Sequence, residues 1–213
     1  MNPLLDFSAL PRFQDLKPEH VTPAVDQLLA EGRATTAAVT HASPSWDAFV
    51  APLEDANERV ARAWGQVSHL HAVLDSPALR EVYNANLPKV TAFHTDLGQD
   101  ERLFSRYRAL ADAPGFASLD AARKKLVENT LRDFRLSGAE LSDDKKTRFK
   151  AIEEELSQLS SRFEDNVFDA TNDYGLLIGD AAKRAFLSGG SSAPPRRKSR
   201  RALSRIFRLA FDS

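Results

Sequence analysis

Apolar residues recur at steps of three and four positions along most of the chain, up to about residue 172. The clearest row is Trp46, Phe49, Leu53, Val60, Trp64, Val67, Leu70 and Leu74. This spacing gathers apolar side chains on one face of an α-helix, whereas a half-buried strand requires strict alternation. No alternating stretch of comparable length occurs, and Gly is sparse before position 175. The sequence therefore predicts an all-α fold built from long antiparallel helices.

Ser and Thr residues just before the periodic rows mark where helices are expected to begin. Their hydroxyls cap free backbone N–H groups, and a following Pro fits the first helical turn. The predicted N-caps are Thr22, Ser45, Ser76, Ser118 and Ser142. The first helix is expected to end near His41, and a further helix covers about Glu101 to Ala111. Pro52 and Pro88 fall inside predicted helices, where they are expected to delay the start or kink the axis.

The last two helices are predicted to form a hairpin. Gly138 stands where a left-handed residue ends the first of them, and Ser142 begins the next after a short connection. The apolar row of this longest helix is Phe149, Ile152, Leu156, Leu159 and Phe163. A 3-4-3-4 spacing is typical of two helices packed nearly antiparallel. Residues 118–137 and 142–172 are therefore expected to pack on each other, with Glu153-Glu154-Glu155 facing solvent.

A change of composition marks a domain boundary near residue 181. Residues 181–213 carry nine basic side chains and one acid, a net charge of +8, whereas the other 180 residues hold 20 basic and 29 acidic groups, a net charge of −9. We expect a helical domain over residues 1–180 and a basic tail over 181–213 that is disordered or arises from a shifted reading frame. A tail of this charge can bind nucleic acid through non-specific, salt-sensitive contacts. With Ile206, Phe207 and Phe211 it would also suit an anionic membrane surface.

The lack of Cys excludes disulfides and zinc sites built on thiolates. The first thirteen residues have neither the basic start nor the apolar core of a secretory signal. No stretch approaches the ~20 apolar residues that a membrane-spanning helix needs. We therefore expect a cytoplasmic protein without a transmembrane segment.

The five histidines are not spaced as metal ligands. A zinc site of the His-Glu-x-x-His type holds one metal with two His one helical turn apart, and this motif does not occur. His69 and His71 are two positions apart, which separates them by about 200° around a helix. His20, His41 and His94 have no second His at the required spacing. No residue is therefore predicted to be catalytic, cofactor-binding or metal-ligating.

Several short blocks, taken together, have a family-specific order and spacing. They are Pro3–Leu5, Leu16–Val25, Val67–Leu70, Ser76–Glu81, Leu87-Pro88, Asn129–Gly138 and Phe163–Thr171. Each block alone is short, but over about residues 3–180 the set resembles the oligopeptidase A type of zinc metallopeptidase, in the thimet oligopeptidase family. The likeness is strongest in the blocks that begin at Asn129 and Phe163.

The resemblance implies an all-helical wall of a channel that admits short, unfolded peptides. It also implies that a later portion of the protein supplies His-Glu-x-x-His and a downstream Glu, which hold one zinc ion, with the motif Glu as general base. No position of this chain matches those residues, so none is carried over. We expect a truncated N-terminal domain that is inactive alone. With apolar surface left uncovered, it should be a loose monomer or a self-associating species.

Two other interpretations stay open. The chain could be a helical binding module that engages a peptide, a nucleic acid or another protein. It could also be one half of a split peptidase that assembles with a separately encoded catalytic half. Steep salt dependence of nucleic-acid binding would favour the first interpretation. Peptidase activity recovered on mixing the two halves would favour the second.

Overall fold

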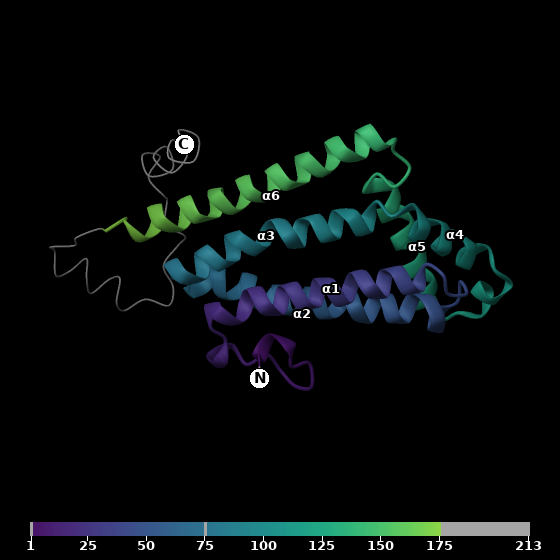
Figure 1. The fold of residues 1–213 in the computed structure, drawn as a ribbon, viewed down its shortest axis with the longest axis horizontal. Coiled ribbons are helices and arrows are strands. Elements are labelled where there is room, and N and C mark those ends of the chain that lie inside the picture. The colour runs from purple at the N-terminus through teal and green to yellow at the C-terminus, as the bar shows by residue number, and fades with distance from the viewer. Residues whose placement is uncertain (1, 75, 176–213) are drawn as a thin grey trace, which may run out of the picture. The chain divides into compact units, whose positions relative to one another are not determined.

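The fold is given by a computed structural model, which describes residues 2–74 and 76–175 (Figure 1). Within these ranges the chain forms six α-helices and no strand, which confirms the predicted all-α class. The helices are α1 (Val21–Val39), α2 (Ala51–Leu74), α3 (Pro77–Gly98), α4 (Glu101–Asp112), α5 (Ala121–Leu136) and α6 (Asp143–Asn172). Their antiparallel order stays a prediction. None of these six helices is long and apolar enough to cross a bilayer.

The chain divides into two units, Met1–Gln158 and Leu159–Ser213. Of the second unit, the structure describes the C-terminal half of α6 and the residues up to Gly175. The predicted domain boundary at residue 181 and the whole basic tail lie outside the described residues.

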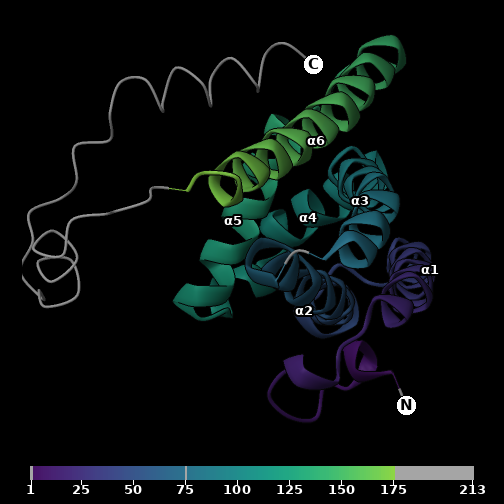
Figure 2. The same cartoon turned by 90° about the vertical axis from the view of Figure 1, so that its left-hand side faces the viewer.

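The first core lies between α1, α2 and α3, which run side by side in both views (Figure 1, Figure 2). Its buried members are Leu4, Val21, Ala24, Val25, Leu28, Leu29, Val60, Ala63, Val67, Tyr83, Val90 and Phe93. Trp64 packs against this core and stacks on Tyr83 with ring centroids 4.9 Å apart. Gly32 lets α1 approach α3 closely, since a Cβ there would lie 2.9 Å from the Phe93 ring. The apolar rows of the three helices therefore form one packed layer, as their spacing predicts.

The second core joins α4 and α5 to the C-terminal end of α1 and the N-terminal end of α2. Its buried members are Val39, Phe49, Val50, Leu53, Leu103, Phe104, Tyr107, Leu110, Val127, Phe134 and Ala139. The Phe49 ring meets the Tyr107 ring edge-on, with centroids 4.8 Å apart. Trp46 packs against this core. Because α1 and α2 supply side chains to both cores, the two cores share two helices.

The start of α2 shows how the chain accommodates Pro52. Ser45 is the cap, as predicted, and its Oγ accepts a hydrogen bond from the N–H of Ala48 at 3.3 Å. The turn Trp46–Val50 is π-helical, and the α-helix begins at Ala51. Pro52 has no N–H to bond back into the preceding turn, so the regular helix starts beside the proline rather than at the cap. The delayed start that Pro52 predicts is confirmed.

The predicted cap of α3 is also confirmed. The Oγ of Ser76 accepts a hydrogen bond from the N–H of Leu79 at 3.3 Å, and Pro77 occupies the first helical position. Pro88 lies inside this helix, as expected. A proline there cannot donate to the carbonyl one turn earlier, and neighbouring packing must hold the helix together.

The predicted cap of α1 is wrong. This helix begins at Val21, directly after the 3₁₀ turn Pro18–His20, so Thr22 is already a helical residue. Pro18 has its φ fixed near the helical value and starts the turn before Thr22 is reached. Pro23 remains compatible with the helix, because N–H groups in the first turn need no intrahelical acceptor.

The predicted cap of α5 is wrong as well. Asp120 caps this helix, and its carboxylate accepts a hydrogen bond from the N–H of Arg123 at 2.8 Å. The hydroxyl of Ser118 instead donates to the carbonyl of Gly115 at 2.7 Å, within the 3₁₀ turn Pro114–Ser118. Asp is as good an N-cap as Ser, so the residue nearer the helix takes that role.

Gly138 ends α5 in the left-handed conformation, with φ of 86°, as predicted. The N–H of Gly138 donates to the carbonyl of Arg135 at 3.1 Å, and the N–H of Ala139 donates to Phe134 at 3.0 Å. These two bonds form a Schellman motif, which satisfies carbonyls that the helix end would leave open. Ala139 is buried beside Phe134 in the second core, so the motif also turns the chain inward.

The first turns of α6 are held by ion pairs. The helix begins at Asp143, directly after the predicted cap Ser142. The ammonium of Lys150 lies 2.6 Å from the carboxylate of Asp96 in α3, and Lys146 pairs with Glu101 in α4. These contacts place the first part of α6 by charge rather than by apolar packing.

The predicted hairpin packing of α5 and α6 is wrong. Ile152 and Leu156, which were expected to face α5, are 45% and 54% exposed. Glu153 and Glu154, which were expected to face solvent, are instead half-buried. The apolar face of α5 already packs in the second core through residues such as Phe134. The apolar row of α6 is therefore turned outward.

Candidate functional site

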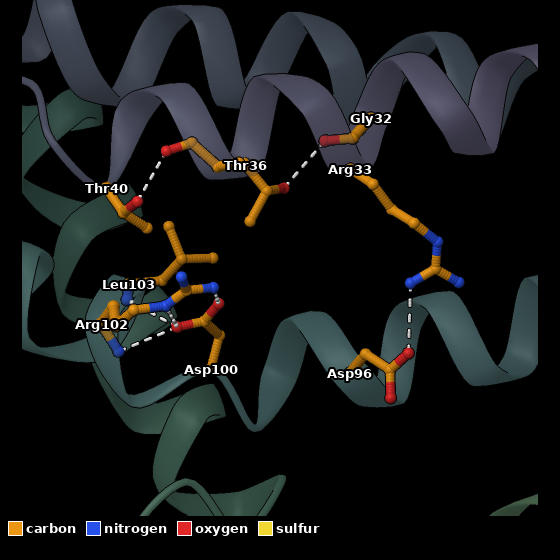
Figure 3. Close-up of polar contacts among 9 residues, drawn as sticks. Gly32, Arg33, Thr36, Thr40, Asp96, Asp100, Arg102 and Leu103 are labelled. Carbon is orange, nitrogen blue, oxygen red and sulfur yellow. Dashed lines mark hydrogen bonds and ion pairs between the residues drawn. The ribbon is translucent and has the colours of Figure 1, made fainter.

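A hollow lies between α1, α3 and the start of α4 (Figure 3). It encloses about 270 Å³. Its lining residues are Arg33, Thr36, Ala37, Phe93, Asp96, Leu97, Asp100 and Arg102. Two acidic and two basic side chains thus line the hollow together with apolar side chains. Neither the composition nor a sequence motif predicts this combination.

One side of this cleft is an ion-pair cluster centred on Asp96. Its carboxylate lies 3.2 Å from a guanidinium nitrogen of Arg33 and 2.6 Å from the ammonium of Lys150. Arg33 also lies over the ring of Phe93, 5.5 Å from its centroid. The pairs are exposed, so each adds less than about 1 kcal/mol to stability. Their contribution is to fix α1, α3 and α6 in register.

The other side of the cleft is built around Asp100. Its carboxylate accepts hydrogen bonds from the N–H groups of Arg102 at 2.8 Å and Leu103 at 3.3 Å, which makes it the N-cap of α4. The Arg102 guanidinium also donates to Asp100 at 2.7 Å. Burial alone would raise the pKa of Asp100, but the hydrogen bonds from Arg102 and Leu103 outweigh it, and the pKa lies below its ordinary value. Asp100 is therefore an ionised helix cap and is poorly suited to donate a proton.

The hydroxyls near the cleft are also engaged within their own helix. Thr36 donates to the carbonyl of Gly32 at 2.9 Å, and Thr40 donates to the carbonyl of Ala37 at 2.7 Å (Figure 3). Activation of a hydroxyl nucleophile requires a neighbouring base within hydrogen-bond reach. Both hydroxyls are therefore already bonded to backbone carbonyls of α1.

The five histidines are dispersed. His20 accepts a hydrogen bond from the N–H of Lys17 at 3.2 Å, and His41 is exposed. His69 packs on Phe13, His71 stacks on Tyr83 at 4.0 Å, and His94 lies beside Phe93. Burial lowers the pKa of His94. Across residues 2–74 and 76–175, no three His, Cys, Asp or Glu side chains gather to hold a metal ion.

The zinc ion that the family resemblance implies therefore finds no matching ligands among the described residues. Two imidazoles on one helix turn with a carboxylate beside them would be needed, and α2 instead directs His69 and His71 to different partners. No catalytic step is assigned to any residue of this chain.

A carboxyl beside the second core has a raised pKa. Glu54 of α2 is half-buried, and its carboxylate accepts a hydrogen bond from the Tyr107 hydroxyl at 3.2 Å. Burial raises the pKa of Glu54 above its ordinary 4.5, and the bond from Tyr107 only partly opposes this. Burial beside Glu54 also raises the pKa of Tyr107. The pair joins α2 to α4 and is a structural contact.

Replacing Glu54 by Gln is expected to change how stability depends on pH. A carboxyl whose folded pKa is raised contributes stability that is complete below about pH 4.5 and is lost as pH rises through the folded pKa. The free energy of unfolding of the Glu54→Gln variant, relative to the original chain, should therefore be more favourable at pH 7 than at pH 4. Urea denaturation at the two pH values measures this. A relative stability that does not change with pH would contradict the raised pKa.

Comparisons with known proteins show which family the chain resembles. Residues 25–146 match the family described as Neurolysin/Thimet oligopeptidase, N-terminal domain. Oligopeptidase A of Haemophilus influenzae is 43% identical over 187 residues, and oligopeptidase A of Escherichia coli is 40% identical over 186 residues. A probable cytosolic oligopeptidase A of Arabidopsis thaliana is 38% identical over 180 residues.

The matches cover most of this chain but only part of each relative. The Haemophilus protein aligns with 87% of the chain, the Escherichia protein with 86% and the Arabidopsis protein with 84%. The chain spans only 28%, 27% and 26% of their respective lengths. The family match extends over more than half of the chain, and it agrees with the all-helical fold. The chain therefore belongs to the neurolysin/thimet oligopeptidase family and carries its N-terminal domain.

Proposed function

We propose that this chain is the N-terminal helical scaffold of an oligopeptidase A-type peptidase and that peptide hydrolysis depends on residues outside it. The observation that carries the proposal is the position of the match, which lies in the N-terminal domain of the family. The two cores and the ion pair between Arg33 of α1 and Asp96 of α3 give the chain the means to hold a fixed helical surface. We further propose that short peptides are the substrates of the complete enzyme and that it works in the cytoplasm.

In this proposal, one portion of the sequence forms the scaffold and another portion supplies the catalytic residues. The 213 residues contain no His-Glu-x-x-His, so the zinc ligands and the general base would come from a catalytic portion. This chain would supply rigid walls and exclude competing, folded substrates. Positioning of this kind contributes to rate even when no scaffold residue touches the reacting atoms.

Hydrolysis of an internally quenched peptide tests the proposal. We expect no turnover by the purified chain, either with added zinc or with a chelator, while oligopeptidase A of Escherichia coli serves as the positive control. Chelator-sensitive turnover that persists through further purification would overturn the proposal. Mixing the chain with the catalytic portion of the Escherichia enzyme, produced without its own N-terminal domain, gives a second result. Recovery of activity would support the scaffold role directly.

A further inference from the structure

The segment of residues 6–16 forms a loop whose two ends are fixed and held together. Leu4 before the loop and Val21 after it are fully buried in the first core. The side-chain amide of Asn2 donates a hydrogen bond to the carbonyl of His20 at 2.8 Å, which ties the two ends. Within residues 6–16, by contrast, no residue is buried. A compact surface loop with neighbouring ends is an Ω-loop.

Contacts inside the loop allow it to keep its shape when it moves. The carboxylate of Asp6 accepts a hydrogen bond from the N–H of Ser8 at 3.1 Å and pairs with the guanidinium of Arg12 at 3.3 Å. Arg12 also pairs with Asp15 at 3.7 Å. These bonds join residues of the loop to one another, so none of them has to break when the loop leaves the rest of the chain.

The loop is held to α2 mainly by polar and aromatic contacts (Figure 1, Figure 2; purple segment). The guanidinium of Arg62 donates to the carbonyls of Phe7, at 3.5 Å, and of Ala9. It also lies 5.8 Å from the centroid of the Phe7 ring, and the guanidinium of Arg59 lies 5.0 Å from the same centroid. Phe7 and Leu16 are half-buried against the edge of the first core, so release of the loop exposes little apolar surface.

Gln66 lies on the same face of α2, between two residues that the loop contacts. It follows Arg62 by four positions and precedes His69 by three, and Phe13 of the loop packs on His69 with ring centroids 5.3 Å apart. Gln66 is only 5% exposed, and its Oε1 has no hydrogen-bond partner among the described residues. A buried acceptor without a partner raises the free energy of the closed state, and water can satisfy it once the loop has moved away.

We propose that residues 6–16 form a hinged flap that opens from α2 while both cores stay folded, and that Arg62 holds this flap closed. Local opening is favoured where a segment has few buried apolar contacts and where its ends are anchored. The open flap uncovers a polar face of α2 that carries Arg59, Arg62, Gln66 and His69. The inference goes beyond the proposed scaffold role, since it gives one part of the scaffold two positions.

Trypsin cleavage after Arg12 tests the proposal. A protease needs several residues of free, extended backbone, so cleavage at this bond requires the flap to open, and its rate follows the population of the open form. The rate in the original chain is expected to be nearly independent of urea well below the unfolding midpoint, because opening exposes little surface. A rate with the same urea dependence as global unfolding would overturn the proposal.

Two positions on α2 should change this cleavage rate in opposite directions. Arg62→Ala removes both bonds to the loop backbone and should speed cleavage about tenfold. Arg62→Lys should speed it about threefold, because one ammonium cannot bond both carbonyls and stack on the ring. Gln66→Leu removes the buried oxygen without a partner and should slow cleavage about threefold. Rates unchanged by the Arg62 variants would show that Arg62 does not hold the flap.

Arg106→Ala is the matched control. Arg106 of α4 also donates from its guanidinium to a backbone carbonyl, that of Thr40 at 2.8 Å, so the same charge and the same kind of bond are lost away from the flap. Cleavage after Arg12 should stay within about twofold of the original rate. Urea denaturation of each variant, followed by circular dichroism, gives the global stability. Cleavage that speeds up equally in the Arg62 and Arg106 variants, in step with lost global stability, would overturn the independent flap.

Discussion

Replacement of Phe49 by Ala is expected to lower the free energy of unfolding by about 3–5 kcal/mol. The ring is fully buried in the second core and meets Tyr107 edge-on at 4.8 Å. Removing it deletes apolar contacts and leaves a cavity between α4 and the turn that precedes α2. The loss is a large part of the ~5–15 kcal/mol that stabilises an ordinary domain.

Urea denaturation followed by circular dichroism measures this loss. Leu10→Ala provides the control, since Leu10 is 86% exposed and its truncation should change stability by less than about 0.5 kcal/mol. Phe49→Leu retains most of the buried volume and should cost less than the alanine variant. Equal, small losses at positions 49 and 10 would mean that the second core is not packed as described.

The second large effect is expected at Gly138. Gly138→Ala should destabilise the chain by about 1–3 kcal/mol, because an L residue is strained at a φ of 86°. A Cβ at this buried position would also lie 2.7 Å from Cδ1 of Leu141, which must move away. The Schellman motif that ends α5 is then weakened together with the burial of Ala139.

Gly65→Ala is the matched control for this prediction. Gly65 lies inside α2, and a Cβ there would meet nothing within 4 Å. The same chemical change should therefore stabilise the helix by about 0.5–1 kcal/mol. Gly138→Asn offers a further comparison, because Asn tolerates the left-handed conformation better than Ala. A Gly138→Ala protein as stable as the Gly65→Ala protein would show that the positive φ is not required.

The elements that the sequence predicts well are those with a local cause. Apolar spacing identifies the buried faces of α1, α2 and α3, because each face is a property of one helix. Ser45 and Ser76 are found as caps, since each bonds an N–H three residues away. Gly138 is found for the same reason, because the helix end requires a left-handed residue there.

The elements that the sequence does not predict depend on a choice between two suitable residues or on contacts between residues far apart in the sequence. Ser118 and Asp120 are both acceptable caps, and only the 3₁₀ turn that engages Ser118 decides between them. The apolar row of α6 is found, but periodicity cannot tell whether a row packs inward or stays exposed. The cleft depends on pairs such as Arg33 and Asp96, which are 63 positions apart and leave no periodic signal.

The two tryptophans allow the cores to be observed independently. Trp46 packs against the second core and Trp64 against the first, and the chain has no other Trp. Phe substitution of either one leaves a fluorophore that reports on a single core. Since α1 and α2 supply side chains to both cores, loss of one core would also weaken the packing of the helices that the other core needs. The two fluorescence signals should therefore change together, which makes the first 158 residues a single cooperative folding unit.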